Sequence, residues 1–96
     1  MKACLGLLTV ELHFDHSGSL KERRSIMSSL KSRLRQRFNA SVAEADFGDV
    51  WQRGGLIVSC AGSNPNIVEQ TLRDIAAFIE QDSRVTTISP SIRFYE

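Results

Sequence analysis

Residues 5–38 read LGLLTVELHFDHSGSLKERRSIMSSLKSRLRQRF, and the spacing of the apolar positions changes once within this stretch. Over residues 5–14 the apolar side chains alternate with more polar ones, which is typical of a β-strand with one buried face. After a turn at 15–18, apolar residues recur every three or four positions, as on one face of an amphipathic helix. The predicted fold therefore begins with one strand that leads into one helix.

The start of this helix is marked by Ser19-Leu20-Lys21-Glu22, which has the pattern of a capping box. In such a box the Ser19 hydroxyl accepts the backbone N–H of Glu22, and the Glu22 carboxylate turns back to the Ser19 N–H. Asn39 is the predicted stop, because asparagine tolerates the left-handed backbone that ends helices. The stripe expected to face the core consists of Ile26, Met27, Leu30, Leu34 and Phe38.

Four further elements follow along the chain. We expect strands at 41–47, 51–61 and 84–95, and a second helix that begins at Asn64-Pro65 with Asn64 as its cap. The buried stripe of this helix is expected to be Val68, Leu72, Ile75, Ala76 and Ile79.

The alternation within these later strands predicts which side chains face the helices. In the second strand we place Ala43 and Ala45 under the helices and Glu44 outward. The last strand is expected to turn one apolar side inward, composed of Ile88, Ile92 and Phe94.

Proline and glycine give two more expectations. Pro90 lacks a backbone N–H, which assigns the last strand to an edge of the sheet. The pair Gly54-Gly55 is expected to mark a bulge or the close approach of another backbone.

An element order of β-α-β-β-α-β predicts an α+β fold, the ferredoxin-like split βαβ sandwich. Residues 1–96 form one such domain in this interpretation, with two helices on one face of a four-stranded antiparallel sheet. The first and third strands are neighbours in that topology, so Cys4 and Cys60 are expected to lie close to each other.

Length and composition set the class of protein. The 96 residues are 42% hydrophobic and 24% charged, which is typical of a globular domain and excludes a disordered chain. No apolar run approaches the roughly 20 residues of a membrane helix, so a soluble cytoplasmic protein is expected. Two distant cysteines and two histidines give no metal-binding spacing, and we predict no metal and no cofactor.

The net charge of +1 hides an uneven distribution of charge. Residues 21–37 contain seven cations and a single acid, whereas the second helix is acidic. Either the cations are solvated or paired with that acidic helix, or they form a stripe that binds the phosphates of RNA. The candidate nucleic-acid-binding residues are Lys21, Arg24, Lys31, Arg33, Arg35 and Arg37.

The sheet face that the helices leave open provides a second candidate surface. Its predicted apolar residues suggest a homo-oligomer, or an assembly or adaptor module that binds other proteins. The candidate interface residues are Leu5, Leu7, Trp51 and Ile57.

The polar part of the same face contains Glu11, His13, Glu44 and Arg53. These types are capable of acid–base chemistry, but an exposed or interfacial charge network accounts for them better. The sequence offers no nucleophile with a base at suitable spacing and no glycine loop for phosphate. We therefore assign no catalytic residue and predict a protein that is not an enzyme.

Two blocks of sequence, Ser19-Leu20-Lys21-Glu22 and Trp51-Gln52-Arg53, together with Glu44, resemble the YlxP-like family of small bacterial proteins. The resemblance implies a ferredoxin-like fold and no established activity. It also implies a link to RNA or the ribosome by association, because members are often encoded beside translation genes. The signature residues that it marks are Ser19, Lys21, Glu22, Glu44, Trp51, Gln52 and Arg53. Among these, we expect Arg53 to pair with Glu44 on the adjacent strand and Trp51 to anchor the hairpin.

Overall fold

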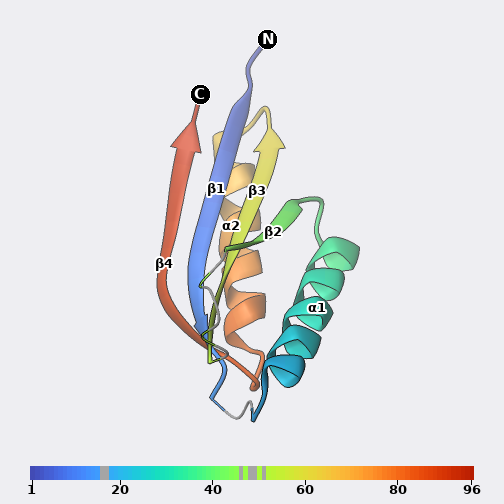
Figure 1. Ribbon diagram of the computed structural model, residues 1–96. Coiled ribbons are helices and arrows are strands. Elements are labelled where there is room, and N and C mark those ends of the chain that lie inside the picture. Colours follow the sequence, from blue (N-terminus) through green and yellow to red (C-terminus); the bar gives the residue numbers. More distant parts are fainter. Residues whose placement is uncertain (16–17, 46, 48–49, 51) are drawn as a thin grey trace.

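The computed structural model describes residues 1–15, 18–45, 47, 50 and 52–96. Its elements confirm the predicted order and are β1 (Cys4–His13), α1 (Leu20–Arg37), β2 (Ser41–Ala45), β3 (Arg53–Gly62), α2 (Pro65–Glu80) and β4 (Thr86–Tyr95). The strands form one sheet in the order β2-β3-β1-β4, and each neighbouring pair is antiparallel. Figure 1 shows α2 lying along the sheet and α1 beside it next to β2. The fold is therefore the α+β ferredoxin-like sandwich.

The core lies between one face of the sheet and the two helices. Alternate residues of β1 and β3 point into it, among them Leu8, Leu12 and Val58, which are fully buried. The apolar stripes of both helices close the core from the other side, with buried residues Met27, Leu30, Leu34, Val68, Leu72, Ile75 and Ile79. The opposite face of the sheet has no helix over it in the described part of the chain.

Both helices begin with side-chain caps at the predicted residues, Ser19 and Asn64, although the sequence pattern predicts the Ser19 N–H, not the Gly18 N–H, as the donor to Glu22. The Ser19 hydroxyl accepts the N–H of Glu22 at 3.1 Å, and the Glu22 carboxylate accepts the N–H of Gly18 at 2.5 Å. The Asn64 side chain accepts the N–H of Asn66 at 3.0 Å, directly before α2. The first helix ends at Arg37 rather than at Asn39, because Phe38 already has an extended backbone.

The glycine pair in β3 makes room for aromatic rings on both faces of the sheet. A Cβ on Gly54 would lie 3.0 Å from the ring of Phe14 on the core side, and one on Gly55 would lie 2.8 Å from the ring of Phe47 on the open side. Pairing of β3 with β1 continues without a shift through both glycines. The close approach is therefore made by side chains, not by a bulge or a backbone.

The edge strand β4 contains a bulge opposite Val10. Its pairing register with β1 shifts between Thr9 and Glu11, and Ser89 adopts a positive φ of 50° just before Pro90. The extra residue reverses the alternation, so Ile88 lies on the open face. The prediction that Ile88 shares a side with Ile92 and Phe94 is wrong for this reason, whereas the edge position of the strand is confirmed.

The predicted orientation of β2 is also wrong. Val42 is 6% exposed and pairs with buried Val58, whereas Ala43 is exposed and pairs with Ile57 of the open face. Burial of the valine, the largest apolar side chain of the strand, fixes which side faces inward. Ala45 lies on the same side as Ala43, and Glu44 lies on the helix side.

The orientation of β2 predicts different effects for the same change at adjacent positions. We expect Val42→Ser to lower the free energy of unfolding by about 2–3 kcal/mol, because it removes methyl groups from the core and buries a hydroxyl. The control Ala43→Ser should change it by less than about 0.5 kcal/mol. Urea denaturation followed by circular dichroism measures both, and a larger loss for Ala43→Ser would contradict the register.

Candidate functional site

Cations on the flank of α1 that faces β2 reach the edge of the sheet. The Lys31 Nζ lies 2.6 Å from a carboxylate oxygen of Glu44. The Arg35 guanidinium donates to the backbone carbonyl of Val42 at 2.8 Å. At the start of the helix, Arg23 donates in the same way to the carbonyl of Arg53 at 2.8 Å. These contacts attach α1 to the edge of the sheet.

Cations on the other flank lie over aromatic rings. The guanidinium carbons of Arg33 and Arg37 are each 5.2 Å from the centre of the Phe78 ring, within the range of a cation–π contact. Phe78 in turn meets Phe38 edge to face, with ring centres 5.9 Å apart. Arg33 also lies 3.8 Å from Asp82. This flank joins α1 to α2 mainly through rings rather than through the acids of α2.

Two of the predicted binding residues differ from the other four in having no polar partner for their side chains among the described residues. Lys21 and Arg24 are exposed, and within the described residues neither takes part in an ion pair or side-chain hydrogen bond. The structure thus divides the predicted stripe in two. Lys31, Arg33, Arg35 and Arg37 have structural contacts, whereas Lys21 and Arg24 have none that the fold requires.

A carboxylate just after α2 connects the end of that helix to α1. The Asp82 side chain is 6% exposed and accepts from the Arg84 side chain at 2.7 and 2.9 Å and from its backbone N–H at 3.0 Å. Arg84 also donates to the Ser29 hydroxyl at 3.3 Å. The Arg84 hydrogen bonds hold the pKa of Asp82 below its ordinary value, although burial acts in the opposite direction. The charged form of Asp82 therefore stabilises the fold.

The lowered pKa of Asp82 predicts that the stability of the fold depends on pH. At pH 7 we expect Asp82→Asn to lower the free energy of unfolding by about 1–3 kcal/mol, because donors of Arg84 lose a charged acceptor. The pKa of Asp82 is lower in the folded than in the unfolded chain. The wild-type protein is therefore more stable than Asp82→Asn by the full amount above the ordinary aspartate pKa. This difference in the free energy of unfolding is lost as the pH falls through the pKa of Asp82 in the folded chain.

Denaturant titrations at pH 7 and at pH 2–3 test this dependence. The matched control is Asp74→Asn, at an exposed carboxylate that accepts only from Gln70 among the described side chains. An Asp82→Asn deficit that is unchanged in acid would contradict the assignment.

The open face carries the apolar residues that were predicted to form an interface. Leu5 is 43% exposed and Ile57 is 36% exposed, whereas Leu7 between them is half-buried. The bulge adds Ile88 to this face, and Tyr95 lies opposite Leu5. Ile88 was not predicted as part of the face; Pro90, two residues further along, was the available signal. The fourth predicted residue, Trp51, lies outside the described residues, as does its predicted anchoring role.

The opposite end of the open face is polar and internally paired. The Arg53 Nε donates to Glu11 at 2.6 Å, and its guanidinium carbon lies 5.0 Å from the centre of the Phe47 ring. The predicted pair between Arg53 and Glu44 is wrong, because Glu44 lies on the other face and binds Lys31. The remaining candidate for acid–base chemistry, His13, lies 2.6 Å from Asp15 through its Nδ1. Asp15 also hydrogen-bonds Thr86.

These pairs give the candidate acid–base residues structural partners. Glu11 is bound by Arg53, whose guanidinium also stacks on the Phe47 ring. Within the described residues, no group of three or more histidine, cysteine or carboxylate side chains is placed to hold a metal ion. The arrangement is that of an exposed charge network.

The two cysteines lie diagonally across neighbouring strands. Cys4 pairs in register with Gly62, and Cys60 pairs with Gly6, so both point to the helix side. Both thiols are free and buried. Burial raises the pKa of the Cys60 thiol, and the nearby Cys4 adds to this effect. A raised pKa keeps the thiol protonated at neutral pH and limits its reactivity.

The signature residues Ser19, Glu22, Gln52 and Arg53 have structural contacts. Ser19 and Glu22 cap α1, and the backbone carbonyl of Gln52 accepts the N–H of Phe14 at 2.9 Å. Neither α1 nor α2 has the length and apolar composition needed to cross a lipid bilayer.

Comparison with known proteins gives one matching family. The sequence profile of a family described as "Protein of unknown function (DUF503)" matches residues 5–92. A curated relative, the "Uncharacterized protein YlxP" of Bacillus subtilis strain 168, is 30% identical over 76 residues. That match covers 79% of this chain and 83% of the relative.

Solved structures resemble the chain in fold alone. The de novo designed protein Foldit4 superposes with a TM-score of 0.61 at 9% identity, covering 99% of this chain and 98% of the designed one. A putative antibiotic biosynthesis monooxygenase from Bordetella bronchiseptica superposes with a TM-score of 0.52 at 14% identity, covering 95% of each chain. Identities this low support the sandwich architecture and carry no function.

Proposed function

The chain belongs to the DUF503 family of proteins of unknown function. We propose that this member binds structured RNA or a ribosomal particle. The binding surface is the outward face of α1, the protein acts in the cytoplasm, and it catalyses no reaction. The proposal is supported by the charge that α1 retains after its intramolecular contacts are counted.

Most cations of α1 keep their charge uncompensated by an acid. Arg23 and Arg35 bind neutral backbone carbonyls, and Arg37 lies over neutral rings. Lys21 and Arg24 have no ion pair with a described residue. Among the described side chains, carboxylates pair with two α1 cations, Lys31 and Arg33. A helix with this excess of positive charge attracts phosphates and releases their counterions.

Polar side chains between the cations suit a phosphate surface. Ser25, Ser28 and Ser32 are exposed at helical spacing on α1. Serine hydroxyls commonly donate to phosphate oxygens, which positions a nucleic acid without reading its sequence. The proposed contact is therefore with the backbone of a folded RNA.

The free cations allow a test that leaves the fold intact. We expect Lys21→Gln/Arg24→Gln to weaken binding to an RNA hairpin and to purified ribosomal subunits about tenfold or more. The slope of log affinity against log salt concentration should fall by about 1.5, because two phosphate contacts are lost. Fluorescence anisotropy at several salt concentrations measures both quantities.

The matched control is Arg73→Gln/Arg93→Gln, which removes the same charge from exposed positions on α2 and β4. Equal effects of the two double variants would indicate net charge alone, and an undiminished affinity of the α1 variant would refute the proposed surface.

The open sheet face favours a second candidate function, self-association as a homo-oligomer or assembly module. The supporting observation is that Leu5, Ile57, Ile88 and Tyr95 are all exposed on this face. An apolar surface of this kind on a small domain commonly marks an interface.

Self-association predicts a change in solution mass. Leu5→Asp/Ile57→Asp should convert an oligomer to monomer, because two charges would have to be buried in the interface. Sedimentation velocity measures the mass, with Ala77→Asp/Ser83→Asp as a control at exposed positions outside the face. A wild-type protein that is monomeric at high micromolar concentration would exclude this candidate.

A further inference from the structure

The third strand extends beyond its partner on one side. Pairing of β3 with β2 ends at Ser59, opposite Ser41, whereas pairing with β1 continues to Gly62, opposite Cys4. Residues 60–62 of β3 therefore have a strand neighbour on the β1 side and no strand on the β2 side. An unpaired strand edge of this kind is a template for another extended chain.

The direction of the backbone groups along this edge follows from the pairing pattern. The N–H of Phe14, directly after β1, donates to the Gln52 carbonyl, so the backbone N–H and C=O of Gln52 point toward the β1 side. In an antiparallel ladder the direction alternates, so even-numbered residues of β3 point toward β1 and odd-numbered residues point away. Ala61 is the odd residue beyond β2, and its N–H and C=O therefore face the unpaired side.

Arginines of α1 bind other free carbonyls along this side of the sheet. Arg23 donates to Arg53, which precedes the part of β3 paired with β2, and Arg35 donates to the outward carbonyl of Val42. The Ala61 carbonyl has no such arginine among the described residues. The thiol of neighbouring Cys60 donates to it, but the sulfur lies 4.0 Å from the carbonyl oxygen, so this hydrogen bond is weak.

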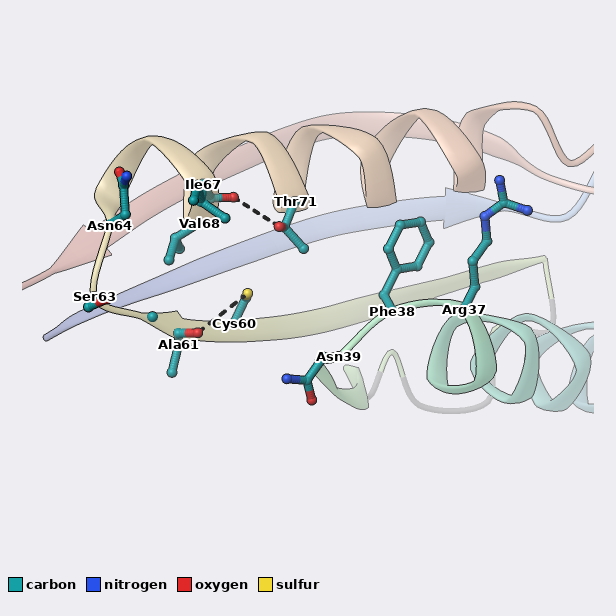
Figure 2. A pocket seen from close by; sticks show the side chains of 11 residues that line it. Arg37, Phe38, Asn39, Cys60, Ala61, Ser63, Asn64, Ile67, Val68 and Thr71 are labelled. Carbon is teal, nitrogen blue, oxygen red and sulfur yellow. Dashed lines mark hydrogen bonds between the residues drawn. The ribbon is translucent and has the colours of Figure 1, made fainter.

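This free edge forms one side of a groove. A pocket of about 480 Å³ lies between the end of β3, the first half of α2 and the end of α1 (Figure 2). Its apolar lining includes Phe38, Val68 and Ile67, and Ile67 is 63% exposed. Among the described residues that line it, the charged one is Arg37. A strand edge beside an apolar helix face is the arrangement that binds extended peptides by strand addition.

We propose that this groove binds an extended segment of a partner protein that carries an apolar residue and a nearby carboxylate. The segment pairs its backbone with the N–H and C=O of Ala61 and continues the line of β2. Its apolar side chain lies against Ile67 and Phe38, and its carboxylate meets Arg37. The site uses the β3 edge, α2 and Arg37 at the end of α1, and it does not include the exposed cations Lys21 and Arg24 at the start of that helix.

Selection from a phage-displayed library of random heptapeptides tests the groove. We expect peptides with an apolar residue next to Asp or Glu to be enriched at least tenfold on the wild-type protein over Ile67→Asp. That variant places a like charge on the groove wall at an exposed position, so the fold should be retained. Absence of enrichment, or equal enrichment on both proteins, overturns the proposal.

Strand addition is tested with a selected peptide and isotope-labelled protein. The peptide should shift the amide resonances of residues 60–62, and Arg37→Gln should weaken its binding about tenfold. Ala61→Pro removes the donor at the edge and should abolish binding, whereas Ala61→Ser should preserve it. If Ala61→Pro fails to fold, N-methylation of successive peptide residues tests the same pairing. Methylation of the peptide N–H that donates to the Ala61 carbonyl is expected to abolish binding.

The same labelled protein and the Ile67→Asp variant also test two other interpretations, in which the peptide binds elsewhere or a second copy of this chain fills the groove. Shifts confined to the outward face of α1 or to the open sheet face would overturn the assignment of the groove. Concentration-dependent self-association that Ile67→Asp abolishes would identify a second copy of this chain as the occupant and would exclude the partner segment.

Discussion

Both helices bury their apolar stripes on the same face of a sheet that is four strands wide. This constraint sets the position of every other group. It turns the polar side of α1 outward and leaves the other sheet face without a helix over it in the described part of the chain. It also requires the glycine at position 6, which gives α2 room to pack on the sheet. A Cβ on Gly6 would lie 2.6 Å from Leu72 and 2.7 Å from Val68.

The cations of α1 have two different roles because of this packing. Those next to the sheet bind carbonyls and a carboxylate of β2 and β3, so they protect an edge that would otherwise be open to other chains. Binding to neutral carbonyls and rings leaves the positive charge in place. The same side chains therefore stabilise the domain and contribute to a field that attracts phosphates.

The two edges of the sheet differ in how far their backbone groups are open to pairing with another chain. The β4 edge is interrupted by a bulge and by Pro90, which has no N–H to offer. On the β2 side, arginines bind the carbonyls of Val42 and Arg53, whereas the Ala61 carbonyl at the end of β3 has no arginine partner among the described residues. The open edge thus coincides with the apolar groove, at a place separate from the exposed cations Lys21 and Arg24.

The sequence by itself determined the six elements, the antiparallel sandwich and the basic character of α1. Those features depend on local spacing and caps, such as the hydroxyl of Ser19 and the proline after Asn64. Helical periodicity also places cations on both sides of the apolar stripe of α1, because residues three and four apart share a face.

Only the tertiary structure decided the orientation of β2, the face of Ile88 and the partners of the charges. A five-residue strand with one valine has too little pattern to fix its side in advance, and a single bulge reverses the alternation that follows it. The partner of Glu44 depends on that orientation, which brings it to Lys31 rather than Arg53. The groove depends on the unequal reach of β2 and β3, which is a property of pairing between distant segments and not of either segment alone.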